Sequence, residues 1–172
     1  MTTLTAEQTR IRSYLQAQGA KLPPAELIAK VQGAMRELYQ AVAAVPAARF
    51  FDRPEPGEWS ANEVMAHVVS TGAYFSARIT QMIAGDSSPL HMTDLARTGA
   101  PGRTLEAWWA DLEQDRSALF AGVARADPDA HLDLTVEHRM FGPLNWREAL
   151  LFLRLHDLDH AGQLNKITAA FS

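Results

Sequence analysis

The sequence contains no cysteine. This absence excludes disulfides, thiolate metal ligands, iron–sulfur clusters and a thiol nucleophile supplied by the chain itself. A metal site would have to use histidine, carboxylate or water ligands. Thiol chemistry would need a thiol from outside the chain.

Basic residues are outnumbered, because 16 lysines and arginines stand against 20 aspartates and glutamates, and the net charge is −4. Neutralising nucleic-acid phosphates requires the opposite sign, so no nucleic-acid partner is expected. No apolar run approaches the roughly 20 residues of a membrane helix. Residues 1–5 lack the basic start and apolar core of a signal peptide. We therefore expect a cytoplasmic protein with no membrane partner.

Four stretches of the chain carry apolar residues at the steps of three and four that are typical of an amphipathic helix. They run from Pro24 to before Pro46, from about Ala61 towards Gly85, from Leu105 to before Pro128, and from after Asn145 to Ile167. Capping boxes at Ser60–Glu63 and Asn145–Glu148 mark two of the starts. The pattern predicts one all-α domain over residues 1–172, a four-helix bundle with its core at about 24–170.

Three further features accompany the predicted bundle. A capping box at Thr5–Gln8 begins a short extra N-terminal helix that ends near Gly19. Residues 85–103 form a long central connection, rich in glycine, proline and serine, of the kind that serves as a lid or a crossover. Partial alternation over residues 131–141, followed by Gly142, permits a small hairpin before the last helix.

Three histidines fall on the inward faces of two of these helices. His156 and His160 are four residues apart on the last helix, so their side chains stand one turn apart on one face. His67 lies about two turns into the second helix, on or near its apolar stripe. Buried imidazoles need partners, and a divalent metal held by all three would supply one. The alternative is that each histidine is simply hydrogen-bonded in the core.

Other residues are candidates for membership of this site. A fourth ligand or an acid–base group could come from three histidines in connecting segments, His91, His131 and His138. The neighbouring Trp108 and Trp109 point about 100° apart on their helix, so at least one is expected in the core and no cofactor pocket is inferred from them.

Carboxylates near the histidines have competing interpretations. Asp157 and Asp159 flank His160 in the sequence and could orient an imidazole, but helix geometry turns both away from the ligand face. We therefore expect both to be solvated. Glu63 could serve the site or close the capping box at Ser60, and the cap is favoured.

Two segments resemble the DinB-like (DinB/YfiT) family of bacterial metal-binding four-helix bundles. Residues 56–67, read as P-G-E-W-S-A-N-E-V-M-A-H, are similar to its Trp-Ser helix start leading to the first metal histidine. Residues 156–164, H-D-L-D-H-A-G-Q-L, are similar to its closing H-x-x-x-H-x-x-Q element. The resemblance extends over about 24–170 and implies metal ligation by a triad, His67, His156 and His160, with Gln163 as a motif residue beside it.

One position departs from the family pattern. Many members carry a basic residue directly after the last histidine, where this chain has Ala161. Any function of that charge is therefore in doubt here, whereas the triad is unaffected.

The resemblance implies metal chemistry, since characterised relatives include mycothiol-dependent isomerases and bacillithiol transferases. Three imidazoles leave positions open on a metal, which can lower the pKa of a bound thiol or water. We expect zinc or nickel, and a transferase that uses an external low-molecular-weight thiol. The alternatives are a metal-dependent hydrolase acting on a small-molecule substrate and a non-enzymatic stress-related module with a structural metal. A homodimer is also expected.

Overall fold

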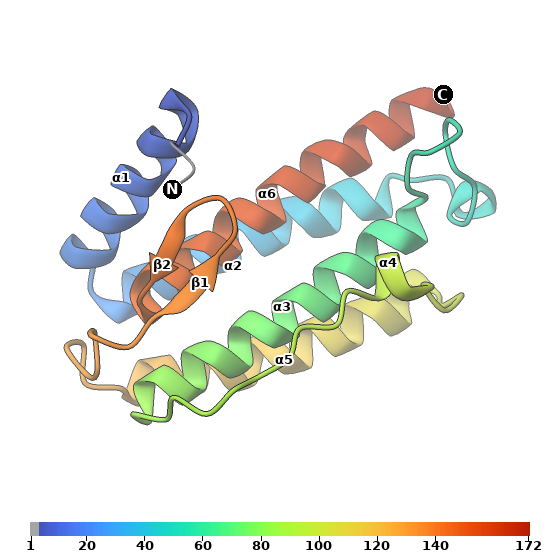
Figure 1. Cartoon of the computed structure of the whole chain (residues 1–172). Coiled ribbons are helices and arrows are strands. Elements are labelled where there is room, and N and C mark those ends of the chain that lie inside the picture. The colour runs from blue at the N-terminus through green and yellow to red at the C-terminus, as the bar shows by residue number, and fades with distance from the viewer. Residues whose placement is uncertain (1–3) are drawn as a thin grey trace.

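Four long helices lie side by side as a bundle in the computed structural model, which describes residues 4–172 (Figure 1). The elements are α1 (Ala6–Lys21), α2 (Pro24–Ala43), the short 3-10 helix η1 (Ala47–Arg49), α3 (Ala61–Ile83), α4 (Leu95–Thr98), α5 (Leu105–Arg125), β1 (Val136–His138), β2 (Gly142–Leu144) and α6 (Trp146–Ala170). The predicted bundle, leading helix and hairpin are all confirmed. The signal-peptide prediction concerns residues 1–5, of which 1–3 lie outside the described residues.

The starts of the long helices follow the local hydrogen bonding that the sequence indicates. At α3 the Ser60 hydroxyl accepts from the Glu63 amide at 3.2 Å, and the Glu63 carboxylate accepts from the Ser60 amide at 2.8 Å. Such a cap stabilises a helix by about 1 kcal/mol. Glu63 also pairs with Arg53, whose hydrogen bond is the main cause that lowers the Glu63 pKa. The predicted capping role of Glu63 is confirmed.

The bundle is organised around α6, which packs against both α2 and α3, while α5 packs mainly against α3. Its interior is divided into two apolar clusters, one towards the hairpin and one towards the opposite end. Between the clusters, polar residues occupy the inward faces of three helices: His67 on α3, Arg116 on α5, and His156, Asp157 and His160 on α6. We call these five residues the polar layer.

A buried ion pair forms one half of the polar layer. Arg116 and Asp157 are both 0% exposed, and Nη2 of Arg116 donates to the two carboxylate oxygens at 3.1 and 3.3 Å. The prediction that Asp157 is solvated is therefore wrong. Neighbouring helices cover α6 over a wide arc, so a position turned about 100° from His156 still faces the interior. Asp159, by contrast, is exposed as predicted.

The long central connection is fastened to the bundle rather than loose. It contains α4, which the sequence did not predict, and Ser70 on α3 accepts a hydrogen bond from the Leu95 amide at 3.1 Å. Nearer α5, the Asn62 side chain accepts from the Trp108 indole at 2.9 Å and donates to the Pro101 carbonyl at 3.1 Å. These contacts hold the connection along α3.

Peripheral elements close the other end of the bundle. The hairpin is antiparallel, with His138 opposite Gly142, and lies in front of α6 beside α1 (Figure 1). The Arg147 guanidinium at the start of α6 donates to the carbonyls of Gly19 in α1 and Pro128 after α5. Within residues 4–172, none of the helices is long and apolar enough to cross a membrane.

Asp157→Asn should lower the free energy of unfolding of the metal-free protein by about 3–5 kcal/mol, because Arg116 would keep a buried charge without its partner. Urea unfolding followed by circular dichroism measures the change. The matched control is Asp159→Asn, two residues away and exposed, which should stay within about 0.5 kcal/mol of wild type. Equal stability of the two variants would contradict the structural role assigned to the pair.

Candidate metal centre

The three predicted histidines converge where α3 crosses the middle of α6. Nε2 of His67 lies 3.1 Å from Nε2 of His156. The ring centroid of His160 lies 4.8 Å from that of His67 and 4.5 Å from that of His156. One ring nitrogen from each residue can be chosen so that all three lie within 4.8 Å of one another. In the part of the chain that the structure describes, this group has three members and no carboxylate.

Two of the rings are oriented by oxygen acceptors. Nδ1 of His67 donates to the Asp94 carboxylate at 2.9 Å, and Nδ1 of His160 donates to the Gln163 side-chain oxygen at 2.8 Å. Because neither oxygen has a proton to give, each ring carries its proton on Nδ1, and its Nε2 lone pair is left available. The hydrogen bonds thus set the tautomers that ligation through Nε2 requires.

The donor set fits one divalent ion. Lone pairs on facing nitrogens 3.1 Å apart repel one another unless a proton or a cation lies between them. Zinc bound tetrahedrally at about 2.0–2.1 Å separates its nitrogen ligands by roughly 3.3 Å, close to the spacing of His67 and His156. Nδ1 of His156 is buried without a hydrogen-bond partner, with the Asp157 carboxylate 3.9 Å away. A proton on this Nδ1 would face the negative charge of Asp157. With the proton on Nδ1, the Nε2 lone pair of His156 is free to bind a metal.

Burial favours the neutral form of His67 and His160. Desolvation, followed by the influence of His156, lowers the pKa of His160 to about 4. The same two causes lower the pKa of His67, and the Asp94 carboxylate offsets them only in part. Neutral imidazole is the form that binds a metal, so these rings are ready to bind one near neutral pH.

Aromatic side chains border the triad on both sides. The Trp59 ring centroid lies 5.1 Å from that of His67, and the Phe152 centroid lies 5.7 Å from that of His156. Beyond Phe152, His138 of β1 stacks on Phe141 at 4.7 Å and tilts against Phe152 at 4.4 Å. The pKa of His138 is lowered to about 4, chiefly by burial. His138 is therefore part of an aromatic wall and does not join the triad.

The other sequence candidates lie away from the triad. His91 is exposed in the central connection, and His131 is exposed with its ring against Gly85. Glu63 is engaged in its helix cap. Asp159 makes no hydrogen bond or ion pair with a triad ring within residues 4–172.

Sequence reasoning missed Asp94. This residue caps α4, where its carboxylate accepts from the Ala96 amide at 3.1 Å and also pairs with Arg97. The only local signal is an aspartate that starts a short helical turn in the connection. Nothing in that signal indicates that the same carboxylate reaches His67.

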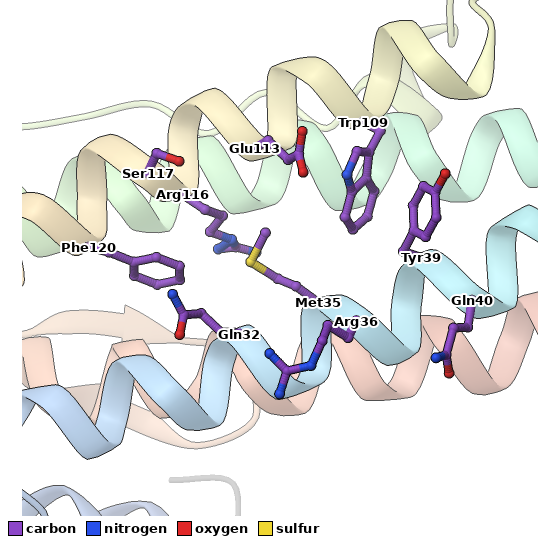
Figure 2. A pocket seen from close by; sticks show the side chains of 10 residues that line it. All are labelled: Gln32, Met35, Arg36, Tyr39, Gln40, Trp109, Glu113, Arg116, Ser117 and Phe120. Carbon is purple, nitrogen blue, oxygen red and sulfur yellow. The ribbon is translucent and has the colours of Figure 1, made fainter.

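A groove of about 940 Å³ lies away from the triad, between α2 and α5 (Figure 2). Aromatic side chains Tyr39, Trp109 and Phe120 line it, together with Arg116 of α5. None of the triad histidines contributes to this groove. The candidate centre is therefore assigned from converging ligand atoms rather than from cavity size.

The metal-free protein should lose stability between about pH 6.5 and pH 4. Unfolded histidines take up protons near pH 6.5, whereas His138 and His160 do so only near pH 4 when folded. Acid therefore favours the unfolded chain in this window. Urea unfolding at pH 7 and pH 5 with a chelator measures the loss, which His160→Gln should reduce and His91→Gln should not. A pH-independent unfolding free energy would refute the assignment of buried neutral rings.

Comparison with known proteins agrees with the geometry. The family model of the DinB superfamily matches residues 30–164. A solved structure titled "Crystal structure of TT2238, a four-helix bundle protein" aligns with a TM-score of 0.61 and 21% identity, covering 83% of this chain and 98% of that chain. At this identity the likeness supports the fold alone. The search of curated proteins found no match. The chain, with its four-helix architecture and the family match over most of its length, belongs to the DinB superfamily.

Proposed function

We propose that this protein binds one divalent ion through Nε2 of His67, His156 and His160, and uses it to activate an external ligand. The observation that carries the proposal is the convergence of three imidazoles with no fourth protein ligand among residues 4–172. Structural zinc sites have four protein ligands, whereas catalytic ones have three and an open position. Three imidazoles suit zinc or nickel, which are the ions we propose.

The surrounding residues hold the ligands in place. Asp94 fixes the ring of His67 and is itself paired with Arg97, while Gln163 fixes the ring of His160. The side chain of His67 is 16% exposed, so the centre can be reached from solvent. Trp59 packs beside His67, and Phe152 packs beside His156. The chain thus orients its ligands and limits the water around them.

The reaction that we propose is transfer of a low-molecular-weight thiol to an electrophile. When bound, a divalent ion would supply the positive charge that lowers the pKa of a thiol near neutral pH. The chain has no cysteine, so the nucleophilic sulfur must come from the co-substrate. The protein residues contribute by binding and orienting that molecule beside the triad.

Hydrolysis is the weaker alternative because it also needs a general base near the attacking water. Of the candidates named from the sequence, Glu63 is held by Ser60 and Arg53, and Asp159 is exposed. Asp94 reaches the site, but its carboxylate already binds His67 and Arg97. A thiol is far more acidic than water, so its activation depends less on a further base, and for that reason we favour it.

Metal content is the first test. The purified protein, dialysed against zinc or nickel, should hold about one equivalent by elemental analysis. Replacing His67, His156 and His160 together with alanine should abolish binding, whereas His91→Ala, an exposed histidine, should not change it. Metal retained by the triple variant would disprove the site. Light scattering on the same samples tests the proposed homodimer.

Asp94→Asn and Gln163→Leu should each weaken metal affinity about 10- to 100-fold, because each removes or weakens the hydrogen bond that orients a ligand. Competition with a coloured chelator measures the affinity. Asparagine at position 94 can still cap α4, so the fold should be retained. Unchanged affinity in both variants would show that these contacts do not support the ligands.

Turnover separates the proposed functions from one another. Thiol conjugation to an electrophile and hydrolysis of esters and amides should be compared for stripped and metal-loaded protein. Conjugation that depends on the metal supports the transferase. Hydrolysis without a thiol supports the alternative. If the metal raises the melting temperature but neither reaction occurs, it has a structural role.

A further inference from the structure

The groove between α2 and α5 borders a buried guanidinium whose hydrogen bonds are incomplete. Arg116, one of the residues that line the groove, is 0% exposed and donates to Asp157 through Nη2 alone. Its Nε and Nη1 atoms are buried without a hydrogen-bond partner among residues 4–172. These two nitrogens carry three N–H groups, which we call the unpaired donors. Buried donors are costly without an acceptor, so this part of the groove is suited to a molecule that brings one.

The neighbours of the guanidinium leave the groove as the source of that acceptor. Towards α6 it meets Asp157, which is already bound through Nη2. Towards α3 it packs against Gly72, where an added Cβ would lie 3.3 Å from Nη2. From α2 the Met35 side chain points towards it (Figure 2). A thioether is a weak acceptor, and the unbranched methionine side chain is adaptable, so Met35 can turn aside and admit an oxygen atom.

The charges around the groove favour an acceptor without a charge of its own. Arg36 on α2 and Glu113 on α5 also line the groove, and both are exposed and of opposite sign. The positive charge of Arg116 is balanced by Asp157. A carboxylate beside Arg116 would be repelled by Asp157 and would lose its own hydration. A carbonyl oxygen accepts the same hydrogen bonds without these two costs.

Aromatic rings lie along the groove on both sides of Arg116. Tyr39 and Trp109 stand at one end, with ring centroids 4.8 Å apart, and Phe120 stands at the other (Figure 2). The Tyr39 side chain remains 46% exposed, so its ring offers free surface to a ligand. Small-molecule sites combine aromatic walls of this kind with a few polar groups that fix orientation.

We propose that the groove between α2 and α5 binds an uncharged aromatic molecule whose carbonyl oxygen accepts a hydrogen bond from the unpaired donors of Arg116. The ring of the ligand packs against Trp109 and Tyr39, and its oxygen takes the place beside the guanidinium that Met35 now occupies. None of the triad histidines lines this groove. The inference is therefore independent of the proposed metal function.

The experiment uses the full chain with carbon-13 in the methionine methyl groups, of which there are six. Three naphthalene probes differ in one substituent at the same ring position: an acetyl group, an isopropenyl group of similar shape, and a carboxylate. The acetyl compound should bind about tenfold more tightly than the isopropenyl compound, because it alone of the two accepts from a charged donor. It should also bind more tightly than the carboxylate. Titrations followed by nuclear magnetic resonance measure the affinities.

The same titration reports on Met35 directly. Its methyl resonance, identified by its loss in Met35→Leu, should shift when the acetyl compound binds. Replacing Arg116→Met and Asp157→Leu together removes the unpaired donors without leaving a buried charge. This double variant should bind the acetyl and isopropenyl compounds equally. Arg36→Gln, on the exposed rim, is the matched control and should keep the wild-type preference.

Equal binding of the acetyl and isopropenyl compounds by wild type, or no binding of any probe, overturns the inference, and neither result needs a variant. A preference for the acetyl compound that survives in the double variant also overturns it. Tighter binding of the carboxylate, removed by Arg36→Gln, would show an anion site instead. A Met35 resonance that shifts with protein concentration, in step with dimerisation seen by light scattering, would assign the groove to a second copy of the chain and reject the small-molecule site.

Discussion

The polar layer is the constraint on which the rest of this structure depends. Apolar clusters fill the bundle on either side of it, and between them five polar side chains are turned inward. Burying such groups costs free energy unless each finds a partner. Most of the layer finds such partners, since Arg116 pairs with Asp157, His67 donates to Asp94 and His160 donates to Gln163. Nδ1 of His156 and two guanidinium nitrogens of Arg116 have no hydrogen-bond partner within residues 4–172. The pair Arg116 and Asp157 joins α5 to α6 across the interior. The histidines join α3 to α6.

The central connection acquires its role from the same constraint. His67 needs an acceptor for its Nδ1 proton, and the connection brings Asp94 to it. Ser70 and Asn62 on α3 fasten the connection on either side of that contact. The central connection therefore contributes a side chain to the candidate metal centre. Its attachment also explains how an exposed stretch of chain can hold a buried carboxylate in place.

Superfamily membership establishes the architecture, whereas function depends on the site built into it. In this chain three imidazoles converge as a group that could hold a metal ion, and no carboxylate belongs to that group within residues 4–172. The aromatic rings of Trp59 and Phe152 then shape what can approach.

The sequence by itself determined the features that depend on nearby residues: four amphipathic helices, the caps at Ser60 and Asn145, and the i, i+4 pair His156 and His160. Helical periodicity and capping hydrogen bonds act within a few residues, so a linear pattern reveals them. The place of His67 beside that pair rested on its inward stripe and on the family resemblance.

Only the tertiary structure decided which partners those residues meet. Asp94 lies 27 residues from His67, and Asp157 lies 41 residues from Arg116. Whether such side chains touch depends on how far each helix is rotated and shifted against its neighbour. No local pattern encodes that rotation, because it results from packing the whole apolar interior at once. For this reason Asp157 was expected in solvent and lies instead at the centre of the bundle.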